Sequence, residues 1–199
     1  GKTTVKEMIG AIFTEAGAVH ISPGNFNNHI GVPLSLANAS QDASGSVFEV
    51  GTSHPGEIAP LTQMVRPDLA MLLNVHNAHI ENFPSRAALI EEKCAIFSTL
   101  PEEGMRVSHD ELDLSGYRFG LRFDSHASIV ALEGNTLHLN LFGEIVKAHV
   151  PGGGAHRALT LAACLLPSAA FMTKSEPEAT PPHSASASDS SSSPNEAHE

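Results

Sequence analysis

The chain begins with a sequence that is typical of a phosphate-binding loop. Gly1-Lys2-Thr3-Thr4 matches the end of the pattern G-x-x-x-x-G-K-[ST], and an amphipathic stretch follows it directly. In such a loop, backbone N–H groups at a helix N-terminus bind phosphate oxygens, the lysine reaches the β- and γ-phosphates, and the first hydroxyl binds Mg²⁺. The pattern therefore predicts a nucleoside triphosphate as ligand. We also expect the first strand and glycine of the loop to precede residue 1, so that the sequence is a fragment.

Four residues are weak evidence, because they also fit a simple turn before a surface helix. The amino-acid composition argues against several other classes of protein. The 199 residues carry a formal net charge of −11 with scattered basic side chains, so we expect no nucleic-acid partner. No apolar run approaches the roughly 20 residues that span a bilayer, and no secretory signal is visible. Cys94 and Cys164 are typical of small buried side chains. We expect a cytoplasmic protein that acts as a monomer.

The first half of the chain alternates strand-like and helix-like stretches. Such alternation predicts an α/β fold with a layered, mostly parallel sheet of the P-loop type, its first strand missing. Ligands of such sheets bind at the carboxyl ends of the strands, and Glu49, Gly51, Asn74, His76 and His79 follow predicted strands. Strands are expected at 18–21, 46–51 and 69–75, and helices at 3–16, 33–39, 55–65 and 85–100.

The second half of the chain has a different pattern of apolar residues and turns. Alternating apolar residues separated by glycine-containing turns predict a small antiparallel meander with strands at 127–132, 136–142 and 145–150. A last helix is expected from His156 to Leu166. From Pro167 the sequence is rich in Ser, Ala, Pro and acidic residues, which indicates disorder. The predicted domains are therefore a partial nucleotide-binding domain at 1–166 and a disordered tail at 167–199.

Four segments taken together carry a family resemblance. In this order they resemble the central ATP-binding domain of the Mur ligases, which build bacterial cell-wall precursors. The run N-F-N-N-H-I-G-V-P-L is the most specific part, and the resemblance covers roughly residues 1–166. The segments are Gly1-Lys2-Thr3-Thr4, residues 24–34, Phe48-Glu49-Val50-Gly51 with residues 54–58, and residues 78–85 with 92–97.

The resemblance implies ATP and Mg²⁺ as cofactors. Gly1, Lys2, Thr3 and Thr4 would bind the phosphates, with Lys2 neutralising their charge and Thr3 binding Mg²⁺. The family uses the residue that matches Glu49 for Mg²⁺. The residue types agree with this role, because a carboxylate at the end of an apolar strand is costly to bury unless it is paired or binds a metal.

The family also assigns roles to His79 and Lys93. The histidine that matches His79 binds a second Mg²⁺, although histidine is not the usual ligand of so hard a cation. The lysine that matches Lys93 is carbamylated, and the carbamate binds Mg²⁺. CO₂ reacts with an uncharged amine, which burial favours by lowering the lysine pKa. Lys2, His79 and Lys93 are thus the predicted catalytic residues. The predicted metal ligands are Thr3, Glu49, His79 and Lys93.

Four further residues are predicted to contact the nucleotide or substrate. Asn27 and Asn28 lie in a loop that the family places near the phosphates, although asparagine is also common in ordinary turns. Gly154-Ala155-His156 matches a family motif near adenine, but Thr160 stands where the family has asparagine. The chain also departs from the family at Thr52-Ser53, at Pro84 and in a shortened stretch at 108–120.

The implied function is ATP-dependent amide ligation in peptidoglycan synthesis. Within the family, the motifs favour the member that adds D-Ala-D-Ala to UDP-N-acetylmuramoyl-tripeptide through an acyl phosphate. Another Mur-type ligase or a folylpolyglutamate-synthase-like enzyme shares the loop, glutamate, histidine and lysine. A third hypothesis is a non-catalytic, truncated nucleotide-binding remnant. We expect the fragment alone to be inactive.

Overall fold

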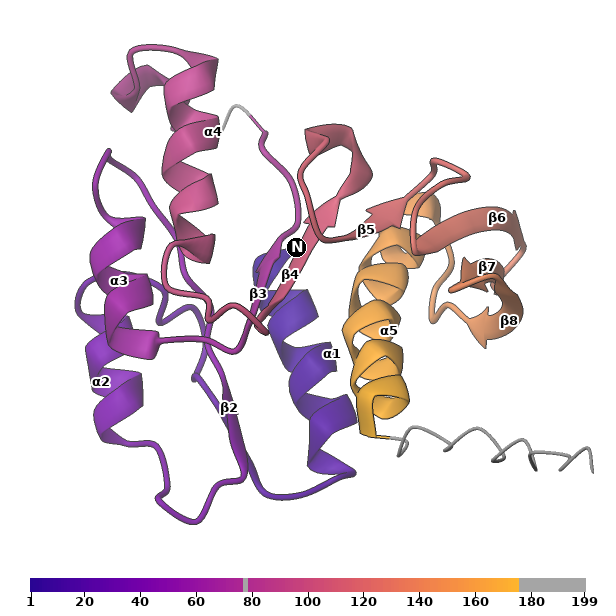
Figure 1. Cartoon of the computed structure of the whole chain (residues 1–199), viewed down its shortest axis with the longest axis horizontal. Helices are drawn as coiled ribbons and strands as arrows, with labels where there is room; N and C mark the ends of the chain where they lie inside the picture. Colours follow the sequence, from indigo (N-terminus) through magenta and orange to yellow (C-terminus); the bar gives the residue numbers. More distant parts are fainter. Residues whose placement is uncertain (77–78, 176–199) are drawn as a thin grey trace, which may run out of the picture.

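A six-stranded sheet and a two-stranded sheet form the middle layer of the protein (Figure 1). The structure is a computed structural model that describes residues 1–76 and 79–175. The larger sheet has the order β3-β4-β5-β6-β7-β8, parallel from β3 to β6 and antiparallel from β6 to β8; β1 and β2 pair in parallel. The predicted α/β class, with its antiparallel meander, is confirmed. The strands are β1 Val19–Ile21, β2 Gly45–Val47, β3 Leu69–Leu72, β4 Met105–His109, β5 Tyr117–Gly120, β6 Ala127–Glu133, β7 Thr136–Leu141 and β8 Glu144–His149.

Helices lie on both faces of the larger sheet at β3 and β4. Helices α1 and α5 pack together and lie on one side of β3 and β4, whereas α3 and α4 lie on the other (Figure 1). This arrangement brings the start of α1 to the end of the sheet where β3 and β4 terminate. The helices are α1 Lys2–Thr14, α2 Gly31–Ala37, α3 Ile58–Val65, α4 Arg86–Cys94 and α5 Ala155–Ser175, with 3₁₀ turns η1 Ile80–Asn82, η2 Ala95–Phe97 and η3 Asp110–Leu112.

Strand β3 shows why both faces are covered. Its side chains alternate between the layers: Ala70 and Leu72 pack in the cluster formed with α4 and η2, whereas Met71 packs against α1. Apolar residues on both sides of a strand need a helix layer on each face. The two layers therefore fix the positions of α1 and α4 relative to the same strand.

Strands β4 and β5 were not predicted. Their sequences interleave polar with apolar residues, which obscures a buried parallel strand. Arg106 of β4 places its guanidinium 4.8 Å from the centroid of the Phe97 ring, so that a charged residue is accommodated beside the apolar cluster. Ser108, also in β4, is fully buried. The meander is continuous with the parallel strands, because β5 pairs with β6.

Several predicted boundaries were wrong. The strand predicted at 46–51 ends at Val47, and the strand predicted at 69–75 ends at Leu72. The helix predicted from Pro55 begins at Ile58. The helix predicted at 85–100 ends as an α-helix at Cys94 and continues as η2. Its predicted cap is confirmed, since the hydroxyl of Ser85 accepts a hydrogen bond from the N–H of Ala88 at 3.1 Å.

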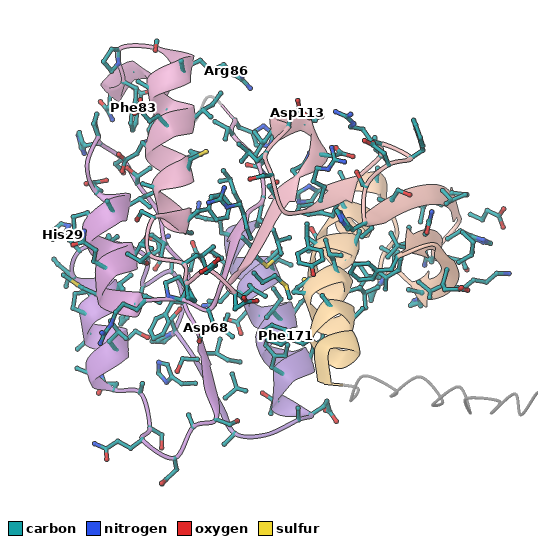
Figure 2. All side chains as sticks on the ribbon, in the orientation of Figure 1. His29, Asp68, Phe83, Arg86, Asp113 and Phe171 are labelled. Atoms are coloured by element: carbon teal, nitrogen blue, oxygen red, sulfur yellow. The ribbon has the colours of Figure 1, made fainter. Side chains whose placement is uncertain are left out.

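The disordered tail was predicted to begin too early. Helix α5 passes through Pro167 and ends at Ser175. Pro167 is fully buried, Ala170 is 1% exposed, and the ring of Phe171 meets that of Phe13 of α1 at 5.7 Å (Figure 2). Burial of this apolar face stabilises the helix and offsets the cost of the proline, which removes one backbone donor and crowds the carbonyl four residues earlier. The remainder of the predicted tail, 176–199, lies outside the described residues.

None of the helices in residues 1–76 and 79–175 is long and apolar enough to cross a membrane.

Leu166 of α5 provides a test of this packing. Its side chain is fully buried in the cluster between α5 and the sheet, so Leu166→Ala should lower the free energy of unfolding by about 2–5 kcal/mol. The control Phe171→Ala removes a ring that is 41% exposed and should cost less. Urea denaturation measures both; equal losses would contradict the packing of α5 described here.

Candidate functional site

A buried carboxylate lies at the centre of the candidate site. Glu49 follows β2 and is 5% exposed. One carboxylate oxygen accepts a hydrogen bond from Thr3 Oγ1 at 2.7 Å, and the other accepts one from Asn27 Nδ2 at 2.7 Å. The backbone N–H of Glu49 donates to Ser22 Oγ at 3.3 Å. The structure therefore joins the phosphate-binding motif, the asparagine loop and the strand end through one side chain.

A buried lysine fixes the loop that carries Asn27. Lys6 of α1 is 3% exposed, and its ammonium group donates to the carbonyls of Ser22 at 2.5 Å and Gly24 at 2.7 Å. It also lies 3.0 Å from the carboxylate of Glu7. These contacts satisfy a charge that would otherwise be costly to bury. Lys6 had no predicted role, because a lysine inside a helix usually reaches solvent.

The two predicted asparagines have different environments. The backbone carbonyl of Asn27 accepts from the N–H of Gly51 at 2.8 Å, so Asn27 contacts the Glu49 segment through both side chain and backbone. The side-chain oxygen of Asn28 accepts from the N–H groups of Ile30 at 3.1 Å and Gly31 at 2.9 Å. Asn28 thus forms a local turn that leads into α2, which is the alternative expected from its residue type.

Lys93 is close enough to Lys2 for their charges to interact. Burial lowers the pKa of the Lys93 ammonium, and the like charge of Lys2 lowers it further. These two predicted catalytic residues, one at the start of α1 and one near the end of α4, therefore lie in the same region.

The nucleotide motif also meets the start of α5. Gly1 precedes α1, and its carbonyl accepts from Val5 N–H at 3.0 Å. A Cβ atom at Gly1 would lie 3.7 Å from Cε1 of His156, so the imidazole is next to the loop. Thr160 is buried, and its hydroxyl donates to the carbonyl of His156 at 3.0 Å. Thr4 lies in the first turn of α1 and is exposed.

His79 is the predicted residue whose place in the site is least defined. It is exposed, has a positive φ of 63° and precedes η1. Within residues 1–76 and 79–175, no hydrogen bond or ion pair joins its side chain to Glu49 or Lys93, and no three His, Cys, Asp or Glu side chains gather as a metal site. The structure thus brings together Thr3 with Glu49, and Lys2 with Lys93, but not the full predicted metal set.

Two further carboxylates shape the segment after Glu49. One carboxylate oxygen of Glu57 accepts from Ser53 N–H at 2.6 Å, His54 N–H at 3.0 Å and Thr52 Oγ1 at 3.0 Å. The two backbone bonds are the main reason that the pKa of Glu57 falls to about 2. Glu92 of α4 accepts from the same segment. Neither carboxylate had a predicted role, although both lie in segments that carry the family resemblance, Glu57 in residues 54–58 and Glu92 in residues 92–97.

The donor set is chemically specific. The Thr3 hydroxyl and the Glu49 carboxylate are hard oxygen donors, which suit Mg²⁺. They lie beside a lysine at the N-terminus of a helix, where phosphate groups bind. This combination defines a candidate site for a metal-bound nucleotide.

Comparisons with known proteins agree with this geometry. Residues 1–120 match the Mur ligase middle domain. The chain is 34% identical over 168 residues to the UDP-N-acetylmuramoyl-tripeptide–D-alanyl-D-alanine ligase of Escherichia coli K12, covering 81% of this chain and 37% of the relative. It is 32% identical over 179 residues to the ligase of the same name from Synechocystis, covering 83% of this chain and 39% of the relative.

Solved structures that resemble this chain come from the same family of ligases. The MurF ligase of Thermotoga maritima in complex with ADP matches with a TM-score of 0.77 and 26% identity, covering 86% of this chain and 43% of that structure. MurF of Acinetobacter baumannii matches in fold with a TM-score of 0.76 and 24% identity, covering 86% and 41%. The chain therefore belongs to the Mur ligase family. It spans about two fifths of the length of these relatives.

Glu57 predicts a pH dependence of stability. Its pKa is about 2 in the folded protein against an ordinary value of 4.5, so its contribution is complete above about pH 4.5 and is lost as the pH falls toward 2. The side chain is 34% exposed, and after allowance for solvent screening we expect Glu57→Gln to cost about 1 kcal/mol at pH 7. Urea unfolding of both proteins across this range measures the difference. A difference that stays constant with pH would contradict the assignment.

Proposed function

We propose that this chain supplies the ATP-binding part of a ligase that joins D-Ala-D-Ala to UDP-N-acetylmuramoyl-tripeptide in the cytoplasm. The observation that carries the proposal is the 2.7 Å contact between Thr3 of the phosphate motif and the buried Glu49. The relatives named for this reaction support the choice of substrates, and the Thermotoga maritima structure contains ADP.

The residues act mainly through position and charge. Backbone N–H groups at the start of α1 and the ammonium group of Lys2 bind the phosphates and stabilise negative charge on the transferring phosphoryl group. The tripeptide carboxylate attacks the γ-phosphorus, the bond to the β-phosphate oxygen breaks, ADP leaves and an acyl phosphate forms. The amine of D-Ala-D-Ala then attacks the acyl carbon, phosphate leaves and the nitrogen loses a proton, which gives the amide. Asn27 orients the Glu49 carboxylate by its hydrogen bond, and His156, whose imidazole is next to Gly1, would contact the nucleotide.

Three of the proposed metal ligands, Thr3, Glu49 and a carbamate on Lys93, would offer the oxygen atoms that Mg²⁺ prefers, whereas His79 would offer a nitrogen. Thr3 and Glu49 would hold one ion, and His79 with a carbamylated Lys93 would hold a second; when bound, these ions neutralise phosphate charge. The lowered pKa of Lys93 favours the uncharged amine that reacts with CO₂, which supports the carbamate. Gly1, Thr4, Asn28 and Thr160 complete the proposed nucleotide contacts.

Phosphate release tests the proposal directly. We expect this chain to bind Mg-ATP without completing the reaction, because it is a fragment, and any phosphate release should require both UDP-N-acetylmuramoyl-tripeptide and D-Ala-D-Ala. Binding of Mg-ATP is measured in parallel by calorimetry, because it isolates the part of the function that this chain carries. A chain that neither binds Mg-ATP nor releases phosphate with both substrates would contradict the proposal and favour an inert remnant.

Lys2→Ala is the matched test of the phosphate motif. Loss of a charge-assisted contact to phosphate should weaken Mg-ATP binding about tenfold or more. Lys147→Ala removes the same charge from the exposed edge of β8 and should leave binding unchanged. Calorimetric titration at low salt separates the two variants. Equal affinity in Lys2→Ala and wild-type protein would remove Lys2 from the site.

A further inference from the structure

Glu92 connects two elements of the candidate site that are distant in sequence. Its carboxylate extends from α4, and its two oxygens accept separate backbone hydrogen bonds, from Gly56 N–H at 2.7 Å and Ile58 N–H at 2.8 Å. Helix α3 begins at Ile58 and has no side-chain cap of its own. A carboxylate at this end also complements the helix dipole. Glu92 therefore caps α3 from a neighbouring helix and attaches α4 to the segment that follows Glu49.

The segment that receives these bonds is the loop at residues 52–58, here called the clamp loop. Its start is fixed because Gly51 donates to the backbone of Asn27, whose side chain bonds to Glu49. Its interior is closed by the three hydrogen bonds to Glu57. The clamp loop is thus held at one end by the Asn27–Glu49 pair and at the other by Glu92.

A second contact reaches the same loop from the turn after His79. Asn82 of η1 donates from its side-chain amide to the carbonyl of Ser53 at 2.9 Å. The chain segments that carry Glu49, His79 and Lys93 therefore all meet at the clamp loop. Glu92 is adjacent to Lys93 on α4. The two hydrogen bonds of Glu92 therefore hold α4 in place next to Lys93, the predicted carbamylated lysine. Phe83, which precedes α4, is buried beside it (Figure 2).

We infer that Glu92 is a positioning residue. Through the clamp loop it fixes α4, so that Lys93 faces the nucleotide site formed by Lys2, Thr3 and Glu49. This inference rests on the proposed function. Asn82 has the same role for the His79 turn, with one hydrogen bond in place of two. Each side chain acts through the backbone that it binds.

Glu92→Gln tests the role. The amide offers one acceptor and one donor in place of two acceptors, so one of the two backbone bonds is lost. Glu91→Gln is the matched control, because it removes the same charge from the neighbouring exposed position of α4. ATP affinity is measured by calorimetry with Mg²⁺ and again in EDTA, at a temperature where circular dichroism shows each variant to be folded.

We expect Glu92→Gln to weaken Mg-ATP binding about tenfold or more, as is typical of residues that orient metal-binding groups. Binding of ATP in EDTA should be unchanged, because the loop at residues 1–4 is intact. A merely structural contact would lower the melting temperature and leave both affinities of the folded protein unchanged. If Glu92→Gln does not fold, Glu92→Asp retains the charge with a shorter reach and is measured in its place.

The outcomes separate the two proposals. If wild-type protein binds ATP equally well with Mg²⁺ and in EDTA, or does not bind ATP, the proposed function and this inference are both wrong. If the ATP affinity of wild-type protein depends on Mg²⁺ but Glu92→Gln binds ATP as Glu91→Gln does, only the role of Glu92 is wrong. A loss confined to Mg-ATP in Glu92→Gln supports it.

Discussion

The buried carboxylate of Glu49 is the constraint on which the candidate site depends. A carboxyl group that is 5% exposed needs partners for both oxygens, and here they come from Thr3 on α1 and Asn27 on the following loop. The requirement ties three segments, separated by up to 46 residues in sequence, to one point. It also leaves hard oxygen donors beside a helix N-terminus, where a metal-bound phosphate is favoured by both charge and geometry.

Other charged side chains around this site also bind the backbone of neighbouring segments. The Lys6 ammonium group holds the loop that presents Asn27 by binding two backbone carbonyls. The carboxylates of Glu57 and Glu92 hold the clamp loop by binding backbone N–H groups. Such contacts fix backbone rather than pairs of flexible side chains, so they cost less side-chain entropy than surface ion pairs do. The sheet positions the helices, and these charged side chains fix the loops at the end of the sheet.

Much of the fold followed from local sequence pattern, and the site followed from motif chemistry. The meander was predicted because its turns contain glycines at Gly134 and Gly143, both with positive φ. Strands β4 and β5 were missed because Arg106 and Ser108 interrupt the apolar pattern and are accommodated only by tertiary packing. Helix α5 was cut short at Pro167 because the contact of Phe171 with Phe13 cannot be read from local composition. Glu92 escaped prediction for the same reason: its partners lie 34 and 36 residues away.

The most direct measurement is the binding of Mn²⁺, as a paramagnetic substitute for Mg²⁺, to wild-type protein and Glu49→Gln in the presence of ATP. Glutamine keeps the shape of the side chain and can still accept a hydrogen bond from Thr3, so the fold should be retained. Electron paramagnetic resonance counts free and bound ions. The account predicts ATP-dependent Mn²⁺ binding by the wild-type chain and a loss of about tenfold or more in Glu49→Gln. Equal Mn²⁺ binding by both proteins would show that Glu49 is not the centre of a metal–nucleotide site.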